Sequence, residues 1–227
     1  MPFAGVTLGV ASWDQEILHA INCGLSGPWA DAILLTLQRS VVGIAAMLIA
    51  IGLVWDRDRR VGLQAFVTAL AAYGLCMGVA DLAWHAHYRA RPGRAADVVL
   101  RSPAEIATCE RQPQAVVVRK HVSRRSGMPS RHALSSGVFA ATMLLASRGL
   151  GLVACLYALL VAMARVYSGV HWPSDVLVGL AVGGAAGWLV WRSVPWVFGR
   201  FGRRRWVEDP AMAPESTSGS RPEDTPG

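Results

Sequence analysis

Long apolar stretches alternate with short polar ones along most of the chain. Five stretches are apolar enough for membrane helices, from about Asp31 to Trp55, Val61 to Trp84, Ala133 to Ser147, Leu150 to Tyr167 and Ser174 to Trp191. A bilayer core about 30 Å thick needs roughly 20 such residues per helix. The third stretch is short, so it spans only if its polar end lies below the membrane surface or the local membrane is thin. The pattern predicts an all-α membrane helix bundle with about five transmembrane helices.

Two flanking segments differ from these stretches. Trp13 to Leu25 carries Ile17, Leu18 and Ile21 at helical spacing, which predicts an N-terminal amphipathic helix on the membrane surface. A plain packing helix is the alternative. From Val207 onward Pro, Ser, Thr, Gly and acidic residues dominate, which predicts a disordered tail over residues 207–227. Residues 1–200 are therefore expected to form a single membrane domain.

Composition and charge strengthen this interpretation. The chain is 53% apolar and 16% charged, with a mean hydropathy of +0.35, which favours a membrane protein over a soluble domain. The net charge is +7, but the basic residues cluster in membrane-flanking loops. Anionic membrane lipid is thus the expected partner, and nucleic acid is not. The four cysteines are scattered without a C-x-x-C pair, which predicts free buried thiols and neither a disulfide nor a zinc site.

Hairpin connectivity brings three polar motifs to one membrane face. The C-terminal ends of the second and fourth stretches lie on the same side of the membrane as the N-terminal ends of the third and fifth. Those ends carry Arg89-Ala90-Arg91-Pro92, Pro129-Ser130-Arg131-His132, and Arg165 followed by His171 and Asp175. We therefore expect the three motifs to meet.

Positive charge also marks the opposite face. The segment from Asp56 to Arg60, the turn at Arg148 and the cluster from Arg203 to Arg205 fall there. Because cytoplasmic loops carry an excess of Lys and Arg, the motif face is expected to be extracytoplasmic. The segment from His85 to His132 on the motif face is itself rich in arginine, which weakens this charge bias.

The third motif has the spacing of a nucleophile and its orienting acid. Asp175 follows His171 by four residues, so it can accept the Nδ1 proton and leave Nε2 as a nucleophile. Arg165 can present a planar fork to phosphate oxygens. The alternative is an interfacial loop in which Asp175 only caps a helix.

The other two motifs add anion-binding and proton-transferring groups. Backbone N–H groups after Ser130 form a positive helix end suited to phosphate, and Arg131 adds charge there. His132, with an ordinary pKa near 6.5, can protonate a leaving oxygen at neutral pH. An ordinary Ser N-cap is the alternative. Arg89 and Arg91 can bind phosphate or simply snorkel at the end of a span.

From about residue 14 to residue 195, the order of these motifs and spans resembles the type 2 phosphatidic acid phosphatase (PAP2) superfamily. The third motif resembles the family's S-R-x5-H-x3-D, with Ala164 in place of Ser. The second resembles P-S-G-H, with Arg131 in place of Gly. The first resembles K-x6-R-P, but Trp84 stands where the Lys would be, and Arg89 is the first candidate to replace its charge.

The resemblance implies a two-step hydrolysis of a lipid phosphate or diphosphate, with undecaprenyl diphosphate as the best guess. His171 would attack phosphorus to form a phosphohistidine, and His132 would protonate the leaving oxygen and then activate water. Arg91, Arg165 and Ser130 would stabilise the phosphoryl oxygens. No carboxylate cluster suited to Mg²⁺ is visible in the sequence, so we expect no metal and no cofactor.

Two other functions remain open at this point. A lipid phosphotransferase would use the same histidine and pass the phosphoryl group to another lipid. A catalytically impaired membrane binding protein would explain the departures at Trp84 and Ala164. The physiological lipid and the oligomeric state are not readable from these motifs, which contact only the phosphoryl group.

Overall fold

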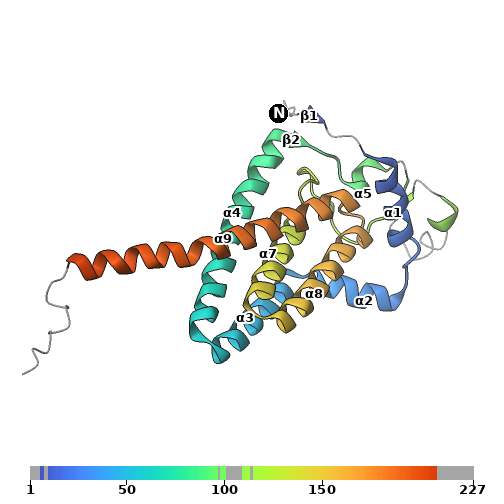
Figure 1. Ribbon diagram of the computed structural model, residues 1–227. Helices are drawn as coiled ribbons and strands as arrows, with labels where there is room; N and C mark the ends of the chain where they lie inside the picture. The colour runs from blue at the N-terminus through green and yellow to red at the C-terminus, as the bar shows by residue number, and fades with distance from the viewer. Residues whose placement is uncertain (1–5, 8–9, 97, 101–108, 113–114, 209–227) are drawn as a thin grey trace, which may run out of the picture.

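Helices make up most of the chain in the computed structural model, which describes residues 6–7, 10–96, 98–100, 109–112 and 115–208 (Figure 1). The helices are α1 Ser12–Asn22, α2 Pro28–Leu37, α3 Ser40–Arg57, α4 Arg59–Ala86, α5 Pro92–Ala95, α7 Arg131–Ala146, α8 Arg148–Tyr167 and α9 Pro173–Glu208, with the 3₁₀ turn η1 Cys109–Arg111. The short strands are β1 Val6–Thr7, β2 His87–Tyr88, β3 Val98–Leu100 and β4 Ala115–Val117. β1 pairs with β2 and β3 with β4, both in parallel.

Two tight helical hairpins form the end of the bundle opposite the motifs. α3 turns into α4 at Asp58, whose carboxylate accepts hydrogen bonds from Arg60 N and Val61 N and so caps α4. α7 turns into α8 at Ser147. Gly62 and Gly151 lie where a Cβ would collide with the backbone of the preceding helix. Glycine at these positions allows each pair of helices to approach closely.

α7 is the central helix and packs against α3, α4, α8 and α9. Its contact with α9 uses glycines one turn apart. A Cβ on Gly179 would lie 2.9 Å from Ser130 O, one on Gly183 would collide with Leu134 O, and one on Gly187 would lie 3.2 Å from Val138 O. Small residues allow close backbone approach where lipid supplies no hydrophobic driving force. This glycine stripe holds the start of α7 beside the start of α9.

Within the residues that the structure describes, four helices are long and apolar enough to cross a membrane: Ser40–Arg57, Arg59–Ala86, Arg148–Tyr167 and Pro173–Pro195. Their outward faces carry exposed apolar side chains such as Leu48, Leu70, Leu152 and Leu189. α7 has 16 residues and is therefore about 24 Å long, less than the bilayer core of about 30 Å. The all-α membrane bundle is confirmed, and α7, which corresponds to the predicted third span, falls short in length.

Two predicted boundaries were wrong. The first apolar stretch is not one helix, because α2 ends at Leu37 and α3 begins at Ser40. Gln38 is buried at this break, where its Oε1 accepts a hydrogen bond from Arg165 of α8, so a tertiary contact favours the interruption. The last helix is longer than predicted and continues to Glu208, which makes the first two residues of the predicted tail helical. The remainder, 209–227, lies outside the described residues.

The N-terminal helix α1 covers the motif end of the bundle. It is amphipathic as predicted: Trp13 and Ile17 are exposed, whereas Asp14, Leu18 and Asn22 are buried. Asn22 Nδ2 donates to Val117 O at 2.9 Å and Tyr167 O at 2.6 Å, and its Oδ1 accepts from Val117 N. A buried amide therefore joins α1 to β4 and to the end of α8.

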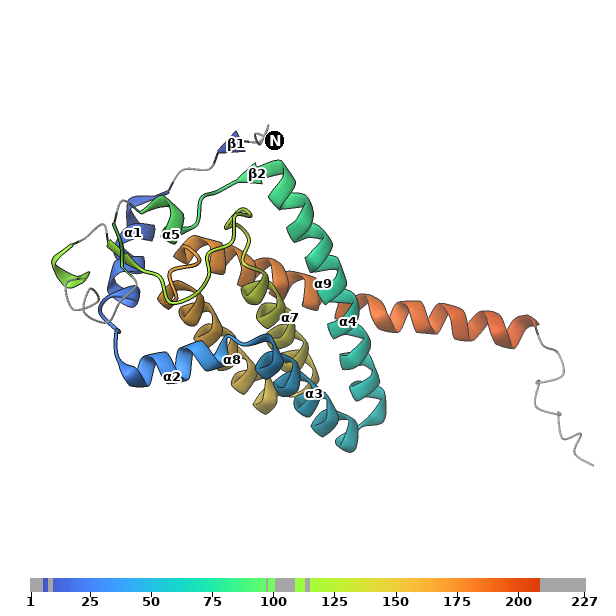
Figure 2. The ribbon, with the colours of Figure 1, turned by 180° about the vertical axis from the view of Figure 1, so that it is seen from behind.

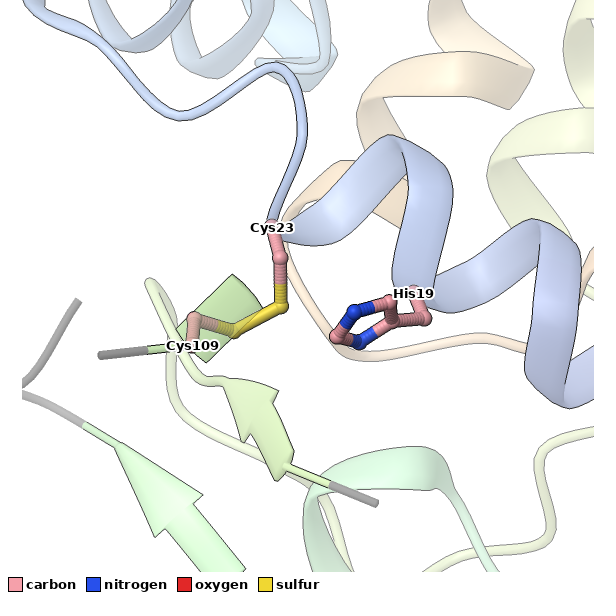
Figure 3. Close-up of side chains that lie close together, drawn as sticks. All are labelled: His19, Cys23 and Cys109. Atoms are coloured by element: carbon pink, nitrogen blue, oxygen red, sulfur yellow. A yellow bond between two sulfur atoms is a disulfide. The ribbon is translucent and has the colours of Figure 1, made fainter. Parts of the chain in front are cut away.

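The prediction of four free thiols was wrong for one pair. Cys23, just after α1, forms a disulfide with Cys109 in η1, and the ring of His19 lies beside it (Figure 3). Cys76 and Cys155 are free. The paired residues are 86 positions apart and belong to no spacing motif, so only the fold brings them together. Because the sulfurs of this His–Cys–Cys group are bonded to each other, they are not thiolate ligands for a metal.

Candidate active site

The three motifs meet at one end of the bundle, as the hairpin connectivity predicted. Figure 2 shows the end of α4 and the starts of α7 and α9 directed toward this end, beside α5 and α1. Backbone hydrogen bonds join the segments: Gly127 N donates to Arg89 O at 2.8 Å, and Ser130 N donates to Asp175 O at 3.2 Å. Gly93 N donates to Gly169 O at 3.1 Å. First, second and third motifs are thereby fixed against one another.

His171 lies in the loop between α8 and α9 and is only 2% exposed. Its Nε2 is 3.0 Å from Arg91 Nη1, and its Nδ1 is 3.4 Å from Asp175 Oδ2. A guanidinium can only donate, so Nε2 must be the acceptor in this contact. The proton of the neutral ring is then on Nδ1, facing Asp175. This is the tautomer that the spacing of the third motif predicts.

Burial lowers the pKa of His171 to about 4. The hydrogen bond to Asp175 opposes this effect, while the positive charges of Arg165 and Arg91 add to it. The imidazole is therefore neutral at pH 7, with a lone pair on Nε2. A neutral ring is the form that a nucleophile requires.

His132 lies in the first turn of α7 and feels the same positive surroundings. Its pKa is lowered to about 3, first by burial and then by electrostatic interaction with Arg165, His171, Lys120 and Arg91, in that order. These are the groups that an anion would neutralise. A bound phosphate would therefore raise the pKa of His132 toward the range in which a histidine can donate a proton.

Arg165 and Ser130 each have a buried polar atom without a hydrogen-bond partner within the described residues, as has His171 at Nδ1. Arg165 is 6% exposed and donates through Nη1 to Gln38 Oε1 at 2.7 Å, but its Nε is unpaired. Ser130 is fully buried at the N-cap of α7, and its hydroxyl makes no capping hydrogen bond. The structure thus disfavours an ordinary Ser N-cap. Buried polar groups normally have partners, and an anion near the start of α7 would supply them.

Arg91 is held in place by the backbone around it. Its Nη1 also donates to Val170 O at 3.1 Å, its Nη2 to Ser126 O at 3.2 Å and its Nε to Arg125 O at 3.2 Å. These contacts fix the plane of the guanidinium beside His171 Nε2. Arg91 therefore lies beside the ring nitrogen that the sequence predicts as the nucleophile.

Arg89 and Arg131 face other groups. Arg89 Nη2 donates to Asp14 Oδ2 at 2.5 Å and its Nη1 to Asp175 Oδ1 at 2.8 Å, so its guanidinium faces two carboxylates. Arg131 pairs with Asp81 at 2.5 Å and lies 4.1 Å from the ring centre of Trp84, so it is directed to α4. The guanidinium of Arg89 is thus turned toward two carboxylates and that of Arg131 toward α4, and phosphate binding by either arginine stays a prediction.

Three residues near the site escaped the sequence reasoning. Gln38 orients Arg165, Asp14 orients Arg89, and Lys120 lies in the electrostatic field of Arg165 and His132. Burial lowers the pKa of Lys120, with Arg165 and Arg39 acting in the same direction. Lys120 is in a loop without periodicity, so no pattern marked it. Asp14 shares a helix face with Leu18 at i+4, and that spacing could have placed it on the buried side.

Comparison with known proteins agrees with this geometry. Residues 89–198 match the PAP2 superfamily. A segment of 67 residues is 42% identical to the undecaprenyl-diphosphatase of Sulfolobus acidocaldarius. That match spans 29% of this chain and only 31% of the relative's length.

Two solved structures share the fold. The crystal structure of LpxE from Aquifex aeolicus matches with a TM-score of 0.62 at 15% identity, over 82% of this chain and 99% of that one. The transmembrane PAP2-type phosphatidylglycerolphosphate phosphatase from Bacillus subtilis matches with a TM-score of 0.53 at 19% identity, over 78% of this chain and 82% of that one. The region that matches the family contains Arg91, Ser130, His132, Arg165, His171 and Asp175. The motifs and the family match together identify residues 89–198 as a PAP2 superfamily region.

Proposed function

We propose that this protein is an integral membrane phosphatase that hydrolyses a lipid phosphate or diphosphate with His171 as the nucleophile. One observation carries the proposal: Nε2 of the buried His171 accepts a hydrogen bond from Arg91, while Nδ1 faces Asp175. An imidazole fixed in this way has its unprotonated nitrogen beside a proposed phosphate-binding group. The names of the relatives, which are phosphatases of lipid phosphates and diphosphates, agree with this reaction.

In the first step the Nε2 lone pair forms a bond to phosphorus, and the bond from phosphorus to the lipid oxygen breaks. The leaving oxygen takes a proton from His132, whose pKa rises when the phosphate is bound. In the second step His132 takes a proton from water, the water oxygen attacks phosphorus, and the N–P bond breaks to release inorganic phosphate. The carboxylate of Asp175 offsets the positive charge that the ring of His171 carries between the two steps.

The groups around phosphorus supply charge stabilisation. Arg91, Arg165, the hydroxyl of Ser130 and the first N–H groups of α7 surround the proposed phosphoryl position. Lys120 supplies the cation that the first motif lacks at Trp84. Its backbone is held near the site because Arg119 N donates to Ser168 O at 3.3 Å, at the end of α8. The donors are cationic and the oxygens of Asp175 are already bonded, which supports a reaction without a metal.

Undecaprenyl diphosphate is the first candidate substrate, because the curated relative is described as an undecaprenyl-diphosphatase. Its diphosphate would meet the cationic site, and its polyprenyl tail would remain in the bilayer. The site as described contacts the phosphoryl group, so other lipid phosphates belong in the same test.

We place the site on the extracytoplasmic side of the membrane. The disulfide between Cys23 and Cys109 lies at the motif end, and disulfides persist mainly in oxidising compartments. The opposite end carries Arg57, Arg59 and Arg60 at the α3–α4 turn, in agreement with the positive-inside rule. The two features point to the same orientation.

The test is release of inorganic phosphate from purified protein in the presence of a chelator. Undecaprenyl diphosphate, phosphatidylglycerophosphate and phosphatidic acid would be compared in detergent micelles. We expect release that His171→Ala abolishes and that the matched control His87→Ala, at an exposed histidine, retains. A phosphorylated lipid product without free phosphate would instead identify a phosphotransferase. Absence of both products with all three lipids would contradict the proposal.

A further inference from the structure

A buried charge network lies behind the nucleophile. The two oxygens of Asp175 have separate partners: Oδ2 faces His171 Nδ1 and accepts from Trp172 N at 3.0 Å, whereas Oδ1 accepts from Arg89 Nη1 at 2.8 Å. Arg89 uses its other terminal nitrogen to donate to Asp14 Oδ2 at 2.5 Å. Asp14 is 1% exposed, Arg89 4% and Asp175 0%. A continuous chain of contacts therefore links α1 to the imidazole.

Further contacts leave this network little freedom. Asp14 Oδ1 accepts from Ser174 N at 2.8 Å and its Oδ2 accepts from Ser174 Oγ at 2.6 Å, which ties α1 to the first turn of α9. Arg89 Nη1 also donates to Ser174 Oγ at 2.5 Å. On the other side, a Cβ on Gly127 would lie 2.8 Å from Asp175 Oδ2. The carboxylate of Asp175 is thus enclosed from both sides.

The signs of the charges explain why two carboxylates are present. Arg89 alone would neutralise Asp175 and weaken its effect on His171, because a guanidinium in direct contact cancels the carboxylate's field. Asp14 offsets the charge of Arg89. The network of Asp14, Arg89 and Asp175 then carries one net negative charge next to a ring that becomes positive when it attacks phosphorus.

We propose that Asp14 and Arg89 are positioning residues for the reaction: Asp14 holds Arg89, and Arg89 holds Asp175 so that one carboxylate oxygen faces His171 Nδ1. The inference rests on the proposed function, because it assigns these residues to the nucleophile of that reaction. It also gives Arg89 a different task from the phosphate binding that the sequence suggested. Neither side chain contacts the phosphoryl group.

Asp14→Asn is the informative variant, because it keeps the shape and removes the charge. We expect kcat to fall roughly 10- to 100-fold, as for other residues that orient a reacting group, with KM nearly unchanged. The remaining positive charge of Arg89 would favour neutral His171, so the acid limb of kcat/KM should move to lower pH. The matched control is Glu16→Gln, an exposed acid on the same helix.

Arg89 is tested by two substitutions. Arg89→Lys keeps the charge but cannot reach both carboxylates with a planar fork, so it should lose most of the activity that Arg89→Gln loses. Arg94→Gln, at an exposed arginine nearby, is the control. If the residues act as one unit, the double variant Asp14→Asn/Arg89→Gln should lose less than the sum of the two single losses.

A signal that needs no turnover separates this inference from the proposed function. In protein labelled with ¹⁵N-histidine, the shifts of His171, assigned by comparison with His171→Ala, report which ring nitrogen carries the proton and at what pH the ring titrates. We expect both to change in Asp14→Asn and to stay unchanged in Glu16→Gln. Unchanged shifts and an unchanged pH profile in folded Asp14→Asn protein would overturn the positioning role. A wild-type protein that shows the Nδ1 tautomer but releases no phosphate would overturn the proposed function alone.

Discussion

At His171, the direction of each hydrogen bond determines which ring nitrogen can act. Helical spacing predicted the contact with Asp175, because residues four apart around the start of a helix lie on one side. The structure confirms that Asp175 faces Nδ1 and adds that Arg91 faces Nε2. The directions of Arg89 and Arg131 were beyond sequence reasoning, because they depend on Asp14 and Asp81, which lie far away in the chain.

The low pKa of His171 has a measurable effect on the pH profile. The ring protonates only as the pH falls toward about 4, whereas an ordinary histidine protonates near 6.5. Because protonation removes the lone pair, kcat/KM should decrease only at pH values well below 6.5. Initial rates between pH 4 and 8 would show this, with His87→Ala as the control. An acid limb at or above pH 6.5 would contradict the burial of a neutral nucleophile.

Lys120 provides a second test at the residue scale. Its charge lies near Arg165 and His132, so removal should weaken phosphate stabilisation. We expect Lys120→Ala to lower kcat/KM about tenfold, the equivalent of one weakened charged hydrogen bond. Lys120→Arg should retain most activity, and Arg124→Ala, at an exposed position in the same loop, serves as the control. Equal rates for Lys120→Ala and the wild type would remove Lys120 from the site.

Among the helices, apolar runs and turn residues predicted most of the boundaries. The hairpins at Asp58 and Ser147 follow from local sequence, because polar residues there separate two apolar runs. The break at Gln38 did not follow, because its cause is a hydrogen bond to Arg165 more than 120 residues away. The local sequence pattern therefore predicts the presence of helices well. It does not predict a helix end that depends on a polar contact with a distant part of the chain.

The glycine stripe of α9 gives a prediction at the element scale. Gly183→Ala should force α7 and α9 apart, because the added methyl group would collide with Leu134 O. Overpacking of this kind costs about 1–3 kcal/mol, and it would also separate His132 from His171. The midpoint temperature of thermal unfolding and the rate of phosphate release should both fall. Gly184→Ala is the matched control, because no atom lies within 4 Å of a Cβ at that position.

Across the whole molecule, one covalent bond joins the N-terminal helix to the loop above the site. The sequence could not predict this pairing, because the two cysteines lie in segments that only the folded chain brings together. The same distance along the chain makes the bond effective against unfolding. A closed loop of this size removes much conformational freedom from the unfolded state.

Loss of the disulfide should therefore lower stability. We expect Cys23→Ser and Cys109→Ser each to cost roughly 2–5 kcal/mol, and the double variant to cost no more than either alone. Thermal unfolding with and without reductant would measure this, and reductant should affect the wild type and the control but none of the Cys23 and Cys109 variants. Cys155→Ser, at a free thiol, is the control. A reductant-insensitive wild type would contradict the bond.

The unbalanced cations beside the two histidines have one more consequence. Under the proposed function, Arg91, Arg165 and Lys120 would attract inorganic phosphate as well as the phosphoryl end of a lipid, because they would recognise only the oxygens. The reaction product would then compete with fresh substrate for the same place. Turnover would depend on how quickly phosphate escapes into the surrounding water, whereas the lipid product would diffuse away in the bilayer.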